Sequence, residues 1–189
     1  MSENCIKRNY ESKERFLTMI KERDRLNNLK RFIGTRKPSI DLGSGGFMPK
    51  FLGVTYACDD NELALEYLKK EKWNGVFEVV DLRKTPLPFG DKQFEVLVCS
   101  EVIEHLDTLD QIKNLFKEID RISKRWVVTT PSPFIPDRDH NFWFSPNDLF
   151  ELIPFEKDYY TIFQKYIHYY ITNDYKKMAK ILNIKNGRK

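Results

Sequence analysis

Ser39-Ile-Asp-Leu-Gly-Ser-Gly-Gly-Phe47 joins a short apolar run to an acidic residue and then to a turn rich in glycine. Because glycine has no Cβ, Gly43 and Gly45 allow the backbone to turn sharply out of a strand and to lie directly against a ligand. Asp41 precedes the turn and can accept a hydrogen bond from a cationic or hydroxyl group. The pattern indicates a nucleotide-type ligand site. The alternative is an ordinary loop, and the flanking sequence has to distinguish the two.

On both sides of this turn, short apolar runs alternate with amphipathic stretches, which is typical of strands alternating with helices. The predicted strands cover 38–42, 54–58, 76–80, 94–99 and 126–130, with an antiparallel pair over 159–172. The predicted helices cover 13–32, Pro49 to Gly53, Asn61 to Gly75, 108–123, Ser145 to Pro154 and 175–182. Thr108 and Gln111 form a capping box at the start of the clearest helix, whose apolar stripe begins at Leu109. These elements predict an α/β fold with a doubly wound, mostly parallel sheet of about seven strands.

Polar side chains follow four of the early strands, at the point where each strand ends. Asp41, Asp59 and Asp81 end the first three, and Ser100-Glu101 follows the fourth. In a parallel sheet these ends share one edge, and ligands bind beyond that edge. Each acid alone is unremarkable, since Asp is common at strand ends. Their joint placement favours a ligand site over four unrelated turns.

Length and charge limit the organisation of the chain. Its 189 residues, 41% of them apolar, suit a single domain over 1–189: an N-terminal helical segment 1–37, a core 38–172 and a basic helix and tail 173–189. No apolar run approaches the roughly 20 residues of a membrane span, so we expect a cytoplasmic protein. Residues 1–37 hold 11 Lys/Arg against 5 Asp/Glu, and 173–189 hold 6 against 1. Such basic ends can attract nucleic acid, although solvated helix faces give the same count.

Two runs of sequence together resemble the class I S-adenosylmethionine-dependent methyltransferases. Asp41-Leu-Gly-Ser-Gly-Gly46 is similar to their D-x-G-x-G loop, and Cys58-Asp-Asp-Asn61 to the acidic end of their second strand. Phe94-Glu-Val-Leu-Val-Cys-Ser-Glu-Val-Ile-Glu-His-Leu106 is similar to the F-D-x-V…S-E-V-x-E-H-L run of one large subgroup. The resemblance spans about 38–153 and implies a Rossmann-like methyltransferase fold with S-adenosylmethionine as cofactor.

The resemblance implies cofactor contacts along the acidic edge. The residues concerned are Asp41, Gly43, Ser44, Gly45, Asp59, Asp60, Asp81, Leu82, Ser100 and Glu101. Asp41 and the glycine loop would hold the methionine part, and Asp59 would accept from the ribose hydroxyls. Asp81 would accept from the adenine amino group beside Leu82, while Ser100 faces the methionine end. Carboxylates suit a ribose diol and a cofactor that bears an ammonium and a sulfonium group.

Candidate catalytic residues come from two places. Methyl transfer is an in-line displacement, so a base is needed only if the acceptor must lose a proton early. His105 and His140 are the candidates, with a purely structural role as the alternative for each. The Pro-rich, aromatic loop 131–144 is longer than a connector needs, which suggests that it lines an acceptor pocket. We find no metal-ligand pattern in the sequence.

Two other functions are alternatives to methyl transfer. An NAD-dependent oxidoreductase requires G-x-G-x-x-G, and Met48 stands where the third glycine should be. A methyltransferase-like fold without catalysis, binding RNA through its basic ends, is supported by Phe47, by Asp60 in a usually apolar position, and by the short helix after the glycine loop. The acceptor is not defined: Cys99-Ser-Glu-Val102 differs from the Asn/Asp-Pro-Pro-Tyr run of enzymes that methylate amino groups of DNA bases or glutamine. Small metabolites, lipids, RNA and protein side chains all remain.

Overall fold

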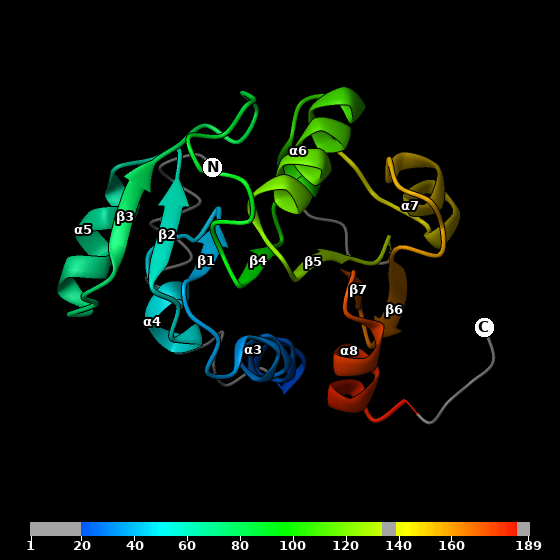
Figure 1. The fold of residues 1–189 in the computed structure, drawn as a ribbon, viewed down its shortest axis with the longest axis horizontal. Coiled ribbons are helices and arrows are strands. Elements are labelled where there is room, and N and C mark those ends of the chain that lie inside the picture. Colours follow the sequence, from blue (N-terminus) through cyan, green and yellow to red (C-terminus); the bar gives the residue numbers. More distant parts are fainter. Residues whose placement is uncertain (1–19, 134–138, 185–189) are drawn as a thin grey trace.

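A computed structural model describes residues 20–133 and 139–184, which form one seven-stranded sheet with helices on both faces (Figure 1). The strands are β1 (Ser39–Leu42), β2 (Tyr56–Asp59), β3 (Val76–Val79), β4 (Val96–Ser100), β5 (Trp126–Pro131), β6 (Thr161–Lys165) and β7 (His168–Thr172). The helices are α3 (Ile20–Ile33), α4 (Met48–Leu52), α5 (Leu63–Lys70), the 3-10 turn η1 (Ile103–His105), α6 (Leu109–Ile122), α7 (Pro146–Leu152) and α8 (Tyr175–Leu182). The predicted α/β architecture is therefore confirmed.

The strand order β3-β2-β1-β4-β5-β7-β6 places the glycine turn at the centre of the sheet. Strand β1 pairs in parallel with β2 on one side and with β4 on the other, so that Asp41 lies opposite both Ala57 and Val98. From β1 the chain builds outward to β3 and then returns to β4. The reversal lies between β1 and β4, and ligands bind at such switch points, beyond the carboxyl ends of the strands.

The other end of the sheet is antiparallel. Strand β7 inserts between β5 and β6 and runs against both, with Ile171 opposite Val128 and Ile162. The antiparallel pair predicted over 159–172 is thus present. Its second strand also brings His168 and Tyr170 next to the central strands, where His168 contacts polar residues of the site.

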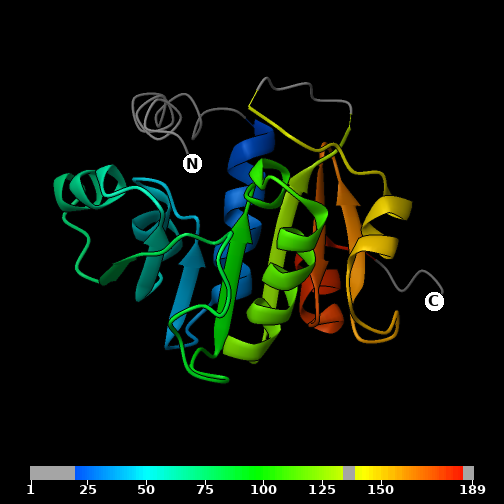
Figure 2. The same ribbon diagram turned by 90° about the horizontal axis from the view of Figure 1, so that it is seen from above.

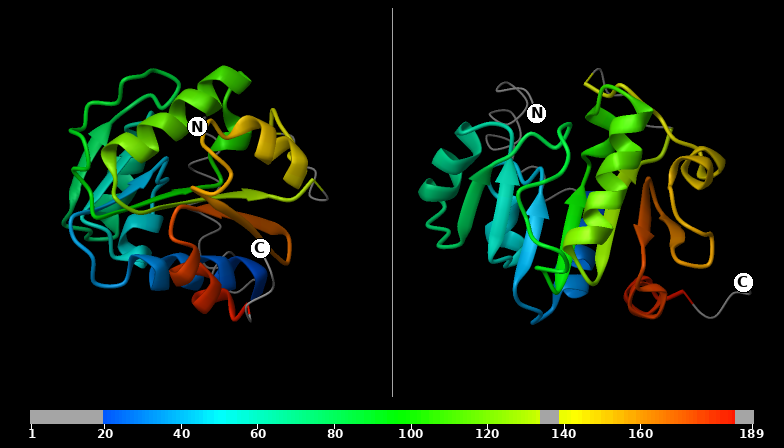
Figure 3. Two further views of the ribbon diagram at one scale, coloured as in Figure 1. Left: turned by 45° about the vertical axis from the view of Figure 1, so that its right-hand side comes forward. Right: turned by 45° about the horizontal axis from the view of Figure 1, so that its top comes forward.

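Two helical layers cover the sheet (Figures 2 and 3). On one face, α6 and α7 contribute Ile112, Phe116 and Leu149 to a core that also includes Trp126. On the other face, α3, α4 and α8 pack side chains against β4, β5 and β7. Helix α5 lies beside the outer strand β3 (Figure 1). None of the helices in 20–133 and 139–184 is both long and apolar enough to span a bilayer.

Local signals in the sequence explain where most helices begin and end. Helix α6 has the predicted capping box, in which the Thr108 side chain accepts from the Gln111 N–H. Ser145 caps α7 in the same way, with Pro146 at the first helical position. Helix α4 ends at Gly53, which adopts the left-handed conformation that glycine tolerates.

Some boundaries differ from the expectations. Strands β1, β2 and β4 begin one or two residues later than predicted, whereas β2 and β4 run one residue further than predicted toward the site, to Asp59 and Ser100. Leu109 is exposed and does not belong to the buried stripe of α6. Glu62, not Asn61, is the N-cap of α5, although the Asn61 side chain still accepts a hydrogen bond from the Leu63 N–H at 2.9 Å.

Candidate functional site

The glycine turn wraps back onto the end of β2. The backbone N–H groups of Gly43 and Ser44 both donate to the Cys58 carbonyl oxygen, at 2.9 and 3.0 Å. Gly43 has a φ of 67°, and an added Cβ would stand 2.5 Å from Cγ2 of Val102. Gly45 also has a positive φ, but its Cβ position is open. Gly43 therefore allows the glycine turn to pack directly against Val102, whereas Gly45 leaves open space above the turn.

Two carboxylates lie buried beside this turn, with 1% of Asp41 and 1% of Asp59 exposed. The Gly45 N–H donates to the Asp59 carboxylate at 3.1 Å, and the Asn61 N–H at 3.3 Å. Burial raises the pKa of Asp59 to about 6. Burial, together with the neighbouring charge of Asp59, also raises the pKa of Asp41 well above its usual value. Oδ2 of Asp41 has no hydrogen-bond partner among the described residues, so a cation or donor at this place would relieve an uncompensated buried group.

A hollow opens beyond β1, β2 and β3, next to these carboxylates. It is lined by Gly43, Asp59, Asp60, Val80, Asp81, Leu82, Arg83, Val102, His105 and Leu106. Arg83 bridges two acids of its wall: its guanidinium lies 2.7 Å from Oδ1 of Asp81 and 3.1 Å from Oδ2 of Asp60. The hydrogen bond from Arg83 lowers the pKa of Asp81. The wall thus combines acidic with apolar side chains.

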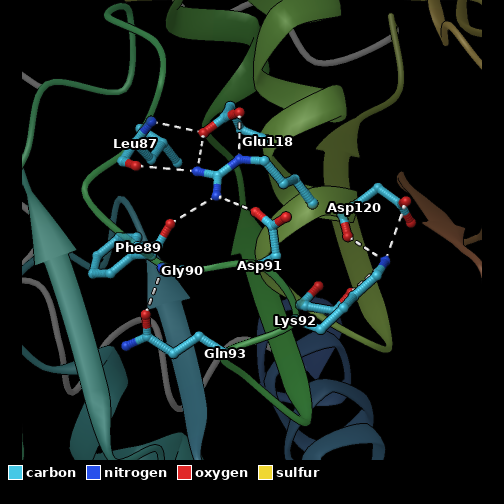
Figure 4. A network of polar contacts seen from close by, with 10 residues as sticks. Leu87, Phe89, Gly90, Asp91, Lys92, Gln93, Glu118 and Asp120 are labelled. Carbon is cyan, nitrogen blue, oxygen red and sulfur yellow. Dashed lines mark hydrogen bonds and ion pairs between the residues drawn. The ribbon is translucent and has the colours of Figure 1, made fainter.

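The loop that carries Asp81 and Leu82 is fastened to α6 (Figure 4). Glu118 accepts from the Leu87 N–H at 2.7 Å, and its carboxylate also pairs with Arg121 at 2.6 Å. The Arg121 guanidinium in turn donates to the carbonyl oxygens of Leu87 and Phe89. This network fixes a loop without regular secondary structure, which is needed if its first residues are to form one wall of the hollow.

Beneath the switch point, the end of β4 meets a buried polar network from α3. Arg25, 3% exposed, donates to Oγ of Ser100 and pairs with Glu22 at 2.8 Å. Glu101 lies 3.9 Å from Arg25 and 3.6 Å from Nε2 of His168. Although burial opposes ionisation, the hydrogen bond with His168 and the charge of Arg25 lower the pKa of Glu22 to about 2.

Glu101 itself has a φ of 56°, a conformation that costs energy in a residue with a side chain. Oε1 of Glu101 accepts from Thr129 Oγ1 at 2.8 Å. Such strain is found mainly where the surrounding structure enforces it, and it is common at functional sites. Here it directs the chain from β4 into η1.

The residues after Glu101 form a second polar group. Glu104 is fully buried, and Thr130 donates to its Oε2 at 3.1 Å. Burial and the neighbouring Glu101 raise the pKa of Glu104 well above its usual value. The rings of His105 and His140 meet edge to face, with centroids 4.9 Å apart.

The structure brings together most of the residues singled out in the sequence, but in three groups. Gly43, Asp59, Asp60, Asp81 and Leu82 line the hollow. Asp41, Ser44 and Gly45 lie in and beside the turn, and Ser100 and Glu101 belong to the Arg25 network. His105 lines the hollow and its ring also contacts that of His140. Residues 134–138 of the loop 131–144 lie outside the described residues.

Several residues of the site were not identified from the sequence. Arg25 looked like one of many charges on an exposed helix face, yet it lies four residues before Leu29 and seven before Phe32, both fully buried. That helical spacing is the signal that could have identified it. His168 had no comparable local signal, because its partners Glu22 and Glu101 come from α3 and from the segment after β4. Arg83 pairs with nearby Asp81, but its second partner, Asp60, comes from the segment after β2.

Comparison with known families identifies this arrangement. Residues 40–126, from β1 to the start of β5, match the model of a family described as "Methyltransferase domain". The match places a methyltransferase domain over these residues. The matched segment contains the glycine turn, all four acidic strand ends and the S-E-V-x-E-H-L run. Comparison with curated protein sequences gives no significant match.

Solved structures share the fold of this chain at low sequence identity. A methyltransferase from Archaeoglobus fulgidus is 15% identical, with a TM-score of 0.64 over 84% of this chain and 96% of that one. A protein from Pyrococcus horikoshii OT3 is 22% identical, with a TM-score of 0.62 over 82% and 92%. The N-methyltransferase NodS from Bradyrhizobium japonicum WM9, in complex with S-adenosyl-L-homocysteine, is 14% identical, with a TM-score of 0.61 over 88% and 98%. At these identities the likeness concerns the fold.

Proposed function

We propose that the protein is a class I S-adenosylmethionine-dependent methyltransferase, which holds S-adenosylmethionine across the glycine turn and the hollow beside it and transfers the methyl group to the acceptor by in-line displacement. When bound, the cofactor supplies an electrophilic methyl group on a sulfonium. The observation that carries the proposal is the Asp59 carboxylate, which lies buried between the Gly45 N–H and the hollow. A buried acceptor at the end of the second strand suits a ribose diol.

The remaining cofactor contacts follow the walls of the site. Asp41, with an unpartnered buried oxygen, suits the ammonium end, and Gly43, Ser44 and Gly45 offer close backbone approach. Asp60, Asp81 and Leu82 border the adenine side, where Arg83 already occupies part of the Asp81 carboxylate. Ser100 and Glu101 lie on the side of the methionine end, where the Arg25 network holds them in place.

On the acceptor side, we assign His105 and His140. Nδ1 of His105 lies 2.7 Å from the Asp139 carbonyl oxygen. A carbonyl can only accept, so Nδ1 carries a proton, and in the neutral ring Nε2 is the nitrogen that has the lone pair. The aromatic residues Phe142 and Trp143 border a second hollow nearby. An acceptor held there would be aligned with the methyl group and shielded from water, which is the main task of the protein in such a transfer.

Replacement of Asp59 by alanine tests the cofactor assignment. Loss of a charged acceptor to a buried diol should weaken the binding of S-adenosylhomocysteine by about 1.5 to 3 kcal/mol, or roughly 10- to 150-fold. Isothermal titration calorimetry measures the change, and Asp158→Ala, at an exposed position, is the control. Equal affinities of Asp59→Ala and wild type would show that the ribose is held elsewhere.

A further inference from the structure

Glu104, His105 and His140, here called the Glu-His-His cluster, place three metal-binding side chains together. One potential ligand atom from each lies within 4.8 Å of the others. Glu104 and His105 come from η1, and His140 from the segment that follows β5. The sequence predicts no metal site, because 35 residues separate the two histidines.

The cluster is held by backbone hydrogen bonds. The N–H groups of Asn141 and Phe142 donate to the Glu104 carbonyl oxygen at 2.8 and 3.2 Å. The Asn141 side-chain amide donates to the carbonyl oxygens of His105 and Leu106 at 3.2 and 3.1 Å. Residues on both sides of His140 are thus fixed to η1 or to His105, since the Asp139 carbonyl accepts from Nδ1 of His105. The proximity of the two histidines is built into the fold.

The ligand atoms of the cluster are arranged as a cation site requires. His105 donates through Nδ1 to a backbone carbonyl, the arrangement that orients metal-binding histidines and leaves Nε2 as the ligand. Glu104 is fully buried, and its Oε1 has no hydrogen-bond partner among the described residues. A buried carboxylate oxygen without a donor is costly, and a bound cation would compensate for it.

We propose that the Glu-His-His cluster binds a first-row divalent transition-metal ion, with Zn²⁺ as the reference ion. Two imidazoles and one carboxylate suit such ions, whereas Mg²⁺ and Ca²⁺ favour sites made of oxygen ligands. With ligand bonds of about 2.0–2.2 Å, the three side chains would have to close by about 1 Å. Three protein ligands leave at least one coordination position open.

The open position would lie between the two hollows. His105 lines the hollow that contains Asp59, and the His140 ring is 6.5 Å from that of Trp143, which lines the second one. An ion there would bind an oxygen of the acceptor and lower the pKa of a hydroxyl group, in place of a histidine base. This consequence rests on the proposed function, but metal binding itself does not.

Titration of the cofactor-free protein with Zn²⁺ alone tests the proposal. Calorimetry should show a single site. Correlation spectra of the histidine side chains should show the signals of His105 and His140 moving together, while His168, the third histidine of the chain, serves as internal reference. No binding at 1 mM Zn²⁺, or a change confined to His168, would overturn the proposal.

Variants separate this site from adventitious binding. His140 lies outside regular secondary structure, and His140→Ala should lower Zn²⁺ affinity at least tenfold. Folded Glu104→Gln should lower Zn²⁺ affinity by a similar factor. Glu156→Gln, at an exposed position, should leave it unchanged. Unchanged affinity in folded His140→Ala would refute the site. Zn²⁺ binding without cofactor binding would refute only the proposed function, and the converse only the metal site.

Discussion

Asp59→Asn should stabilise the cofactor-free protein at neutral pH, even though it removes a proposed cofactor ligand. The folded-state pKa of Asp59 is about 6, against 3.8 for the ordinary carboxyl. A carboxyl whose pKa is raised by folding favours the folded state only while it is protonated, so its ionisation lowers stability as pH rises from about 4 to about 6. At pH 7.5 this penalty amounts to about 3 kcal/mol, and at pH 5 to about 1.5 kcal/mol.

Asparagine cannot ionise, so the variant avoids the whole penalty. It keeps one of the two hydrogen bonds that Asp59 accepts, from Gly45 or from Asn61, and loss of the other costs about 1 kcal/mol. The expected net gain is therefore about 2 kcal/mol at pH 7.5 and about 0.5 kcal/mol at pH 5. The difference between the two pH values reflects the titration of Asp59 together with that of Asp41, whose pKa is raised partly by the charge of Asp59.

Urea denaturation at the two pH values measures these gains, with Asp158→Asn as an exposed control. S-adenosylhomocysteine should bind the variant more weakly, because an amide offers the diol one acceptor oxygen instead of two. A stability change that is equal at pH 5 and pH 7.5, or a loss of stability that grows with pH, would refute the conclusion that Asp59 is a buried carboxyl group with a raised pKa.

Two further predictions concern the framework of the site. Gly43→Ala should destabilise the protein by about 2–4 kcal/mol, because a positive φ is combined with a contact of 2.5 Å, whereas Gly45→Ala, at a similar φ in open space, should cost only about 1 kcal/mol; equal losses in urea denaturation would contradict this. Arg25→Met should cost about 3–5 kcal/mol, because the buried charge of Glu22 would lose its arginine partner and keep only the contact with His168. Combining it with Glu22→Gln should recover part of that loss, and simple additivity of the two changes in urea midpoint would argue against the pair.

The parts of the fold that could be predicted depend on local chemistry. The apolar runs that end in Asp41, Asp59 and Asp81 give strands, and parallel geometry alone brings those ends to one edge. Capping at Thr108 and Ser145 marks helix starts, because the side chain satisfies backbone groups a few residues away. These features need no knowledge of distant contacts.

The parts that could not be predicted depend on pairings between distant segments. Arg25 meets Ser100 across 75 positions of sequence, and His168 reaches Glu22 only because β7 inserts beside β5. Likewise, His140 meets His105 only because Asn141 docks onto η1. The helical spacing of Arg25 indicates that it is buried, but no periodicity in the sequence encodes its partners. The acidic edge was therefore foreseeable, while the contacts of the buried network beneath it and the Glu-His-His cluster were not.

Calorimetric titration of the wild-type protein with S-adenosylmethionine, S-adenosylhomocysteine and NAD tests the central claim most directly. We predict that the first two bind at one site per chain, because the buried acids and the glycine turn suit the parts that they share. NAD should not bind, since the turn lacks the third glycine of a dinucleotide site. Absence of binding of both S-adenosyl compounds at 1 mM, or tighter binding of NAD, would contradict the account.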